Sequence, residues 1–483
     1  MQDKLTFNKN TDDYLFLDRL IPEDHLLKVI NKKVDLSFIG LITEHLYCPN
    51  NGRPSIAPEL YFRMMLLSYL FSIKSIRKLV NEVRYNIAYR WFCGLTLKDK
   101  IPHHASLSRV TKRFDKEIFE QIFLNILNQC QEADLLDEQS VMVDSTFIQA
   151  NASLNSMKPI HDSIPDKKIP HTNEKKEKWQ LSNKTHRSLS DPDASLAFKA
   201  GTTKGLKYKA HVCCDSKNRI ITDIHVTTGS THDSQPFIDL IKRLQKRMPC
   251  ELNEVIADRA YGTGTILSFL KDRKIDSFIP LFTTRSGNNN SSEFEGITYD
   301  TEQETYICNN NIAFHASKIN SQGYIIYRTR VKDCRNCPLS DACNAPFIKG
   351  REIRVISRHI HDNLFKQVKK EMETNTFKQK LKERLWKIEG VMNELKNHNN
   401  LLRAKYRGIN NVQIQAYMAA IAINIKRLVF FVLIFYHSYI LNSSKNTTFY
   451  NRPVSYISQT SRLQPKNIKQ SLSYFQNKLS VSS

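Results

Sequence analysis

Two short apolar runs that each end in an aspartate constrain the fold of this chain more than any other feature. Residues 140–144 read S-V-M-V-D, and residues 254–258 read E-V-I-A-D. Short apolar runs bounded by polar residues are typical of buried strands. We therefore expect Asp144 and Asp258 to lie at the carboxyl ends of neighbouring strands, at the open edge of a sheet.

The sequence around these runs alternates between strand-like and helix-like patterns. The strand-like segments are 208–214, 220–228 and 276–281, and the helix-like segments are 234–247 and 264–274. Strands that alternate with helices predict a mixed α/β domain, here residues 136–440. Two polar stretches, about 151–205 and 283–352, are expected to be insertions into that domain.

Helical patterns flank this region on both sides. Residues 1–135 predict an all-helical basic domain, and the segments after residue 358 predict two more helices. Pro58 suits a first helical position, with Ser55 as its cap, and Ser72 and Ser106 are expected to cap the next two helices. The expected helices are 58–71, 72–93, 106–133, 365–400 and 412–436. Residues 441–483 are expected to form a flexible tail.

The charge of the chain predicts a polyanionic partner. Lys and Arg number 71 against 48 Asp and Glu, a net charge of +23, which suits either nucleic acid or an anionic membrane surface. The most apolar run, Leu428–Tyr436, is about half of the roughly 20 residues that a membrane span needs. We therefore expect a core helix, no membrane, and a nucleic acid as the partner. Ten cysteines without a secretion signal indicate the cytoplasm.

A third acid is expected from a helix packed beside the two strands. Glu389 fits, because Asn393, Lys396 and Asn400 follow it at helical spacing and would share its face. Three carboxylates are hard ligands of the kind that Mg²⁺ prefers. Glu394 is the second choice, and each acid by itself could equally be a cap or a surface residue.

Together these segments resemble the DDE transposases of bacterial insertion sequences, specifically the IS-five-like superfamily. The resemblance runs from about Gly52 to Arg427. It rests on the helical stretch G-R-P-S-I-A-P-E-L-Y-F-R-M-M-L-L, on V-M-V-D-S-T, on V-I-A-D-R-A-Y-G and on R-L-W-K-I-E-G-V-M-N-E-L-K. One departure is Gly390, where relatives often carry Pro or Arg.

The resemblance implies a fold, an activity and partners. It implies an RNase H-like core behind a helical DNA-binding domain, with Asp144, Asp258 and Glu389 as the catalytic ligands of Mg²⁺ or Mn²⁺. The expected reaction is cleavage of DNA followed by strand transfer, on terminal inverted repeats and on target DNA. Holding two ends together implies a homodimer on double-stranded DNA, associated with the bacterial nucleoid.

Further residues are expected to contact DNA or to hold a structural metal ion. Lys396 and Arg384 would steady the phosphates, because they resemble the family's Arg/Glu/Lys signature. The other predicted DNA-binding residues are Arg77, Lys78, Arg109, Arg403, Lys405 and Arg407. A cysteine cluster could hold a structural zinc ion, and its members are Cys308, Cys334, Cys337 and Cys343. Free cysteines are also often small buried apolar residues, so both readings stay open.

Two alternatives belong to other functional classes. A non-catalytic DNA-binding protein derived from such an element would keep the basic helices without needing the acids. An RNase H-like nuclease would cut DNA without joining it. Retention of all three acids favours the transposase over the first, and joined products would separate it from the second.

Overall fold

The computed structural model describes residues 12–443, apart from 49–50, 52–54, 138, 161–181, 199–202, 248–250, 282–293, 322, 336, 341–342, 344 and 349–352. The chain divides into two compact units. The first unit is Met1–His232, Leu244–Glu251 and Trp386–Ser483, and the second is Asp233–Arg243 and Leu252–Leu385. The tail predicted at 441–483 lies outside the described residues from 444 onwards.

The first unit begins with short helices, as the sequence predicts. These are α1 (Asp12–Leu20), α2 (Leu26–Lys33), α3 (Phe38–Thr43), the 3-10 turn η1 (Glu44–Leu46), α4 (Pro58–Leu70), α5 (Ile76–Tyr85), α6 (Ile87–Phe92), α7 (His104–Arg113) and α8 (Lys116–Glu132). Pro58 is the first residue of α4, which confirms that prediction.

The predicted caps are displaced. Ala57, not Ser55, precedes α4, and Ser75, not Ser72, caps α5 through a hydrogen bond from the Lys78 N–H. Ser72 instead adopts a left-handed backbone conformation with φ 54°. The expected helix 106–133 is divided, because Asp115 accepts the Ile118 N–H and starts α8 there. Local side-chain hydrogen bonds therefore fix boundaries that apolar periodicity leaves open.

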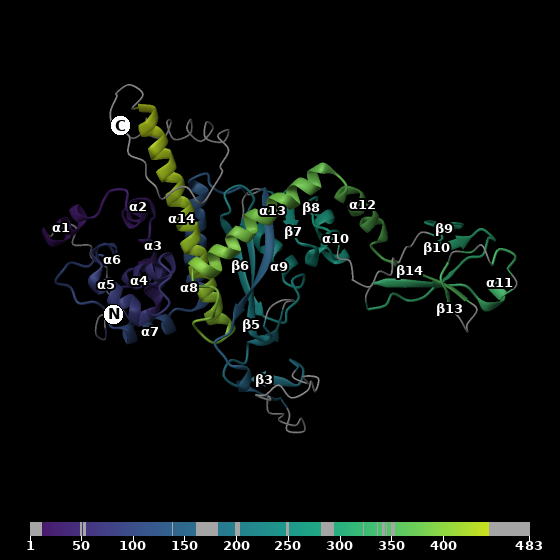
Figure 1. Cartoon of the computed structure of the whole chain (residues 1–483), viewed down its shortest axis with the longest axis horizontal. Coiled ribbons are helices and arrows are strands. Elements are labelled where there is room, and N and C mark those ends of the chain that lie inside the picture. The colour runs from purple at the N-terminus through teal and green to yellow at the C-terminus, as the bar shows by residue number, and fades with distance from the viewer. Residues whose placement is uncertain are drawn as a thin grey trace. The chain divides into compact units, whose positions relative to one another are not determined.

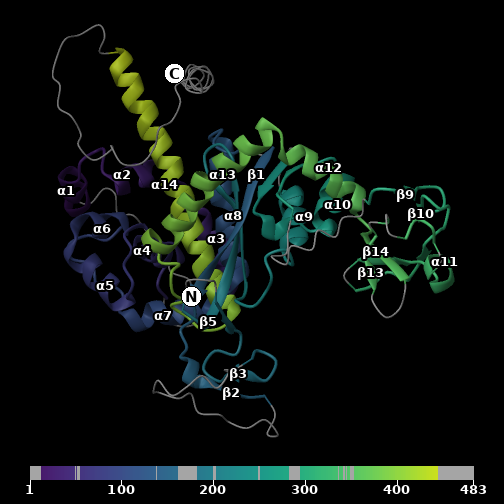
Figure 2. The same cartoon turned by 45° about the vertical axis from the view of Figure 1, so that its right-hand side comes forward.

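The sheet of the first unit is antiparallel. Strand β5 (Gly205–Asp215) pairs along one edge with β1 (Ser140–Gln149) and along the other with β6 (Ile221–Thr228) and β4 (Ser195–Ala197). The predicted insertion contributes β4, the 3-10 turn η2 (Leu154–Ser156) and a ladder of β2 (Met157–Pro159) with β3 (His186–Ser188). Figure 2 shows this ladder close to β5.

The long helix α14 (Ile409–Ser443) completes this sheet, running beside β6 and α8 (Figure 1). Two of its buried side-chain amides pair with the backbone of β6. The Gln413 amide accepts the Val226 N–H at 2.7 Å and donates to the Ile224 carbonyl at 2.8 Å. The Asn424 amide accepts the Ile221 N–H at 2.8 Å and donates to the same residue's carbonyl at 2.9 Å. These amides provide hydrogen-bond partners for backbone groups of the edge strand β6 that would otherwise need water.

The same helix is the one described segment that is apolar and long enough to cross a membrane. The candidate span is Ile409–Phe431, with a mean hydropathy of 1.3, and 78% of its window is buried inside the protein. Its buried amides have partners within the first unit. Both facts agree with the prediction of a core helix.

The second unit contains a parallel strand pair and its connecting helix. Strand β7 (Glu254–Ala257) is followed by the 3-10 turn η3 (Arg259–Tyr261) and α10 (Gly264–Asp272), and then by β8 (Asp276–Phe278), which pairs with β7. The start of α13 (Asn375–Asn393) packs here. Lys380 Nζ contacts both Glu254 carboxylate oxygens, at 2.6 and 2.8 Å. The helix α9 (Phe237–Arg247) precedes β7 in the chain.

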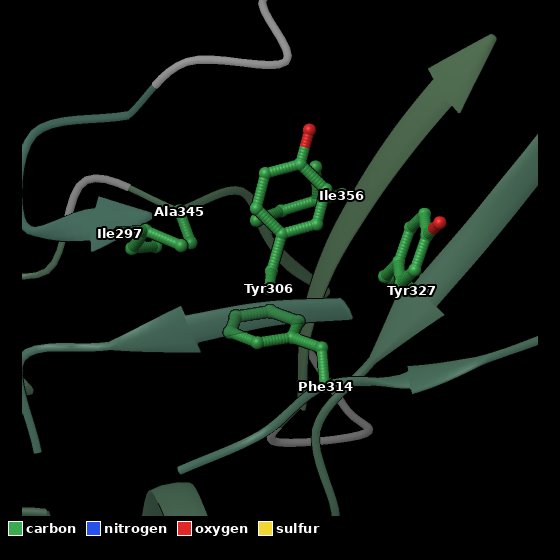
Figure 3. Close-up of a cluster of buried hydrophobic side chains, with 6 residues drawn as sticks. All are labelled: Ile297, Tyr306, Phe314, Tyr327, Ala345 and Ile356. Carbon is green, nitrogen blue, oxygen red and sulfur yellow. The ribbon is translucent and has the colours of Figure 1, made fainter. Parts of the chain in front are cut away.

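The second polar stretch, predicted as an insertion at about 283–352, belongs to a small β-structure with its own core that continues to His359. It comprises the ladder of β9 (Ile297–Asp300) with β10 (Thr305–Cys308), and a sheet in the order β11 (His315–Ala316), β12 (Tyr324–Arg328), β14 (Ile353–His359), β13 (Phe347–Ile348), with the short helix α11 (Val331–Arg335). Figure 3 shows Tyr306 at the centre of six buried side chains. The centroid of its ring lies 5.1 Å from that of the Tyr327 ring and 6.3 Å from that of the Phe314 ring, and both pairs are edge to face.

Candidate active site and nucleic-acid-binding residues

Asp144 lies in the middle of a strand. Strand β1 continues to Gln149, so the prediction that it ends at the aspartate is wrong. The segment after it, S-T-F-I-Q, keeps the β-branched and aromatic residues that favour a strand. Asp144 pairs with Val212 of β5, and its Oδ1 accepts the N–H of Ser145 at 2.7 Å. A half-buried carboxylate within a hydrogen-bonded ladder has a fixed direction.

Asp258 directly follows β7, as predicted. It is exposed, it caps η3, and its Oδ1 accepts the Arg259 N–H at 2.7 Å. Its backbone carbonyl accepts the N–H of Tyr261 at 3.0 Å. The carboxylate is therefore held at the end of the strand by a tight turn.

Glu389 is exposed on α13, in the part of the helix that belongs to the first unit. Glu394, the alternative, is half-buried and forms two contacts with Arg427 Nη2, at 2.8 and 2.9 Å. That pair occupies the Glu394 carboxylate, whereas Glu389 faces solvent. The structure therefore favours Glu389 as the residue available to a ligand.

The helix around Glu389 differs from the prediction of one helix over 365–400. The structure has α12 (Asp362–Met372), α13 and then a π-helical segment, Glu394–His398. Asn400 adopts φ 60°, and its side-chain amide donates to the Ser68 carbonyl at 2.7 Å. Asn400 is thus buried against α4 and does not share the exposed face of Glu389. π-Segments shift the register of a helix, and this one ends the predicted stripe.

Gly390, the departure from the family pattern, lies close to the side chain of Arg219, which would have to shift by a few tenths of an ångström to admit a larger residue. A side chain at this position would place its Cβ 3.2 Å from Nη1 of Arg219. Burial and the charge of Arg427 lower the pKa of Arg219, and the charge of Glu394 opposes them. A small residue after Glu389 leaves room for this guanidinium.

Two predicted DNA-binding residues that are distant in the sequence line one pocket. Arg77 on α5 and Arg109 on α7 both face a cavity of about 680 Å³ in the helical region. Lys78 is exposed but does not line it. The sequence singled out the two arginines without indicating that they line the same pocket, and their contact with DNA stays a prediction.

The predicted basic segment around Lys405 lies against the end of β1. Gln149 and Arg403 form a parallel bridge, and the Ala404 N–H donates to the Gln149 carbonyl at 2.8 Å. Arg403 and Arg407 are exposed, and Arg407 Nε donates to the Asn151 carbonyl at 3.1 Å. Burial lowers the pKa of Lys405 to about 8, and its ammonium lies 4.4 Å from the centre of the Tyr69 ring.

The two residues of the predicted Arg/Glu/Lys signature are less accessible than expected. Arg384 is only 8% exposed, and Lys396 is half-buried in the π-helical segment. Both have interactions within the protein. Their predicted contact with phosphate stays a prediction.

The four cysteines of the predicted zinc site are free thiols of intermediate exposure. Cys308 and Cys343 pack against the aromatic core, and Cys334 Sγ lies 3.1 Å from Thr329 Oγ1. In the part of the chain that the structure describes, no three His, Cys, Asp or Glu side chains are grouped closely enough to hold a metal ion. Zinc binding stays a prediction.

Two acids that the sequence did not single out position the start of α14. Asp191 Oδ1 accepts the N–H of Gly408 at 3.0 Å and the hydroxyl of Tyr208, and Asp193 Oδ2 accepts the N–H of Ile409 at 2.9 Å. Carboxylates stabilise a helix N-terminus. The motif D-P-D at 191–193 gives little local signal of this role, because the backbone amides that it binds, at Gly408 and Ile409, lie 217 and 216 positions away.

Comparison with known proteins gives two family matches. Residues 15–113 match a family described as a transposase domain, and residues 135–425 match one described as a transposase DDE domain. No curated protein sequence matches the chain. Among solved structures, the piggyBac transposase synaptic complex with hairpin DNA is 10% identical with a TM-score of 0.26, covering 94% of this chain and 89% of that one. The Mos1 transposase paired-end complex is 8% identical with a TM-score of 0.17, covering 59% and 81%.

Proposed function

This chain belongs to the DDE transposases, and from that premise we propose that Asp144, Asp258 and Glu389 are the carboxylates that carry its chemistry. The observation that carries the proposal is that one family match, residues 135–425, spans all three acids. The surroundings of each acid, taken singly, support the role, and among the described residues no three His, Cys, Asp or Glu side chains lie close enough together to hold a metal ion. Asp144 is fixed within β1, Asp258 is fixed after β7, and Glu389 is exposed on α13 while its neighbour Glu394 is occupied by Arg427.

The donor set suits a hard divalent cation. Three carboxylates, with water and substrate phosphate as the remaining ligands, match the preference of Mg²⁺, and Mn²⁺ accepts the same oxygen ligands. Two such ions, when bound, activate the attacking oxygen and stabilise the leaving one. The contribution of the chain is to hold the Asp144 and Asp258 carboxylates in a fixed direction, which lowers the cost of assembling the site.

The reaction proposed is cleavage at the ends of the element followed by joining to a target. In the first step a water oxygen attacks a backbone phosphorus, the bond to the 3′ oxygen breaks, and a 3′-hydroxyl is released. In the second step that hydroxyl attacks a target phosphodiester and displaces its 3′ oxygen. The substrates are terminal inverted repeats and target DNA, and a homodimer at the nucleoid would hold the two ends together.

The test is an in vitro reaction on a labelled fragment that carries the flanking genomic ends, with Mg²⁺. Wild type is compared with Asp258→Ala, Glu389→Ala and, as the matched control on the same chain segment, Glu394→Ala. Loss of a ligand that supplies about 4 kcal/mol to the transition state corresponds to about 1,000-fold in rate. We expect that loss for Asp258→Ala and Glu389→Ala with DNA binding retained.

Each other outcome contradicts part of the proposal. If Glu394→Ala abolishes cleavage and Glu389→Ala does not, the third ligand is wrongly assigned. Broken DNA without joined products would identify a nuclease. Binding without any metal-dependent product would identify a non-catalytic DNA-binding protein.

A structural zinc ion in the insertion is a second, separate part of the proposal. It is supported by the C-x₂-C spacing of Cys334 and Cys337, which lie on one turn with the Cys337 N–H donating to the Cys334 carbonyl at 3.4 Å. The test is the zinc content of the purified protein, with the double variant Cys334→Ser/Cys337→Ser as control. Absence of zinc from wild type prepared without chelators would refute it.

A further inference from the structure

The helices α5 and α7 line an open pocket at the protein surface, and the charged residues of its lining are basic. In Figures 1 and 2 the two helices lie beside each other at the N-terminal end of the chain, and their contacts confirm it. The pocket has a volume of about 680 Å³. Its polar lining consists of Ser75, Arg77, His104, Ser108, Arg109 and Lys112.

The sequence of α7 builds one wall of this pocket. His104, Ser108 and Lys112 recur every four residues and so form one stripe along the helix, with Arg109 beside them. Leu107 and Val110, on the other side, are buried at 0% and 4% exposure. Burial of the apolar side fixes the rotation of α7, and that rotation turns the basic stripe into the pocket.

The start of α5 builds the opposite wall. Ser75 caps this helix of ten residues, and its Oγ accepts the Lys78 N–H at 3.4 Å. The first backbone amides of a helix point along its axis and carry partial positive charge. Arg77, in the first turn, adds a full charge at the same place. Both contributions favour an anion between the two helices.

The charges that meet here repel one another. Arg77, Arg109 and Lys112 are all exposed, and none of the residues that line the pocket is acidic. Partial burial, with the charges of His103 and Arg77, lowers the pKa of His104. Positive potential in a concave site attracts anions and raises their local concentration.

The size of the pocket indicates what kind of anion it would hold. A volume of about 680 Å³ falls within the range of about 300–1,000 Å³ that holds drug-sized ligands. That space suits a segment of sugar–phosphate backbone better than a single free phosphate. Arg, Lys and Ser are also the side chains that most often contact DNA phosphates.

We propose that the α5–α7 pocket binds the sugar–phosphate backbone of duplex DNA through Arg77, Arg109 and Lys112. The inference rests on the proposed function, because a transposase must hold its DNA ends while it cuts them. It goes further by assigning this contact to backbone phosphates and not to bases. The helical region would then supply affinity at this pocket, without reading sequence there.

The experiment uses the full-length protein and two duplexes, one with the genomic end sequence and one with that sequence scrambled. The dissociation constant is measured between about 50 and 300 mM salt, a range over which phosphate contacts lose most of their strength. The variants are Arg77→Gln, Arg109→Gln and Lys112→Gln. The matched control is Arg84→Gln, an exposed arginine of α5 outside the pocket lining.

Each pocket variant should weaken binding to both duplexes by the same factor, and should reduce the slope of log K against log salt by about 1. The control should leave the slope unchanged. Ser108→Asp, which places an acid in the pocket, should weaken binding more than Ser108→Ala does. Thermal unfolding of each variant shows whether the fold is retained.

Three results would overturn the inference. Slopes equal to that of wild type would mean that the pocket contacts no phosphate. A loss confined to the end sequence would assign the arginines to bases. An equal reduction of the slope by Arg84→Gln would show that the positive charge of the whole helical region attracts DNA and that this pocket is not a specific contact. If wild type binds neither duplex, the proposed function itself fails, so the two failures are distinguishable.

Discussion

The two β-regions of this protein complete their cores in different ways. In the sheet that carries Asp144, the edge strand β6 is satisfied by side-chain amides of α14, from residues 187 and 203 positions away in the sequence. In the insertion, the core lies within residues 297–356 and consists largely of tyrosine and phenylalanine rings. The first sheet needs the end of the chain to be complete, whereas the second needs only its own segment.

This difference predicts how far the loss of one contact destabilises each region. Contacts between residues far apart in the sequence close long loops, and the entropy of those loops is lost before the contacts form. The loss of such a contact therefore destabilises all of the segments that it joins. A core built from neighbouring strands can open by itself. Asp144 and Glu389 belong to the first unit, so the placement of these two acids depends on its long-range contacts, whereas Asp258 belongs to the second unit.

Removal of the central ring of the insertion is expected to have the largest effect. Tyr306→Ala should cost about 4 kcal/mol, because it deletes a buried aromatic side chain that contacts the rings of Tyr299, Phe314 and Tyr327. Hydrogen exchange should accelerate in β9, β10, β12 and β14 and stay slow in β1 and β5. Faster exchange in β5 as well would break the comparison, because the insertion would then not be an independent core.

Loss of the Asn424 side-chain amide should lower the free energy of unfolding by less than Tyr306→Ala does, but the effect should extend over the whole first unit. Asn424→Leu keeps the volume of the side chain and leaves the N–H and carbonyl of Ile221 unsatisfied, at about 3 kcal/mol for the two groups. Denaturant unfolding followed by circular dichroism measures it. Asn410→Leu, at an exposed position of the same helix, should change stability little. Equal costs would mean that the amide is not required at the edge.

A buried carboxyl in the turn between β5 and β6 gives the first sheet a pH dependence. Burial raises the pKa of Asp215 to about 7, although its oxygens accept backbone N–H groups of Lys217 and Asn218, which favour the charged form. In the unfolded chain an aspartic acid titrates near pH 4. The folded state therefore retains the proton longer, and stability falls as pH rises from about 4 to 7.

Replacement of this carboxyl tests that expectation. Asp215→Asn should remove the decline, because an amide in place of the carboxyl has no proton to lose in this pH range. Urea unfolding at several pH values between 4 and 8 measures the difference between wild type and the variant. Parallel curves for the two proteins would show that Asp215 does not titrate in this window.

The sequence predicted the strands well and their partners poorly. The runs before Asp144 and Asp258 are apolar and short, so periodicity alone identified β1 and β7. It did not extend β1 beyond Asp144, because Ser145 and Thr146 look like the start of a turn. The break before α13 was also missed, where Thr374 Oγ1 accepts the Phe377 N–H at 3.3 Å in a run of charged residues. A hydroxyl cap is a local signal that could have located it.

Other features had no local signal. Gln413 and Asn424 look like isolated polar residues in an apolar helix until β6 lies beside them. Asn400 fits the predicted stripe with Glu389 until the π-helical segment turns it towards Ser68. Arg77 and Arg109 line one pocket because of how α5 packs on α7. Hydrogen bonds and packing between distant segments decide these placements, and one sequence does not contain them.

The smallest expected effect contrasts one cation in each region. Lys405 lies over the ring of Tyr69, and burial lowers its pKa to about 8, so folding disfavours its charge. Arg358 of the insertion lies 3.8 Å from the centre of the Tyr299 ring, and it also pairs with Asp362 at 3.0 Å. Burial opposes the charge of Arg358, but Tyr306 and Asp362 outweigh it and raise its pKa.

The two substitutions to methionine should therefore have opposite signs. Lys405→Met should stabilise the protein by about 0.5 kcal/mol at pH 7, because the loss of cation–π attraction offsets most of the relieved desolvation. It should also remove a rise in stability between pH 8 and 10, where the folded lysine has lost its proton and the unfolded one has not. Arg358→Met should destabilise at every pH. Thermal unfolding measures the stability change of both variants. DNA binding by Lys405→Met tests whether the Lys405 ammonium also contacts a phosphate. Unchanged affinity would remove Lys405 from the predicted DNA-binding residues, and a smaller slope of log K against log salt would keep it among them.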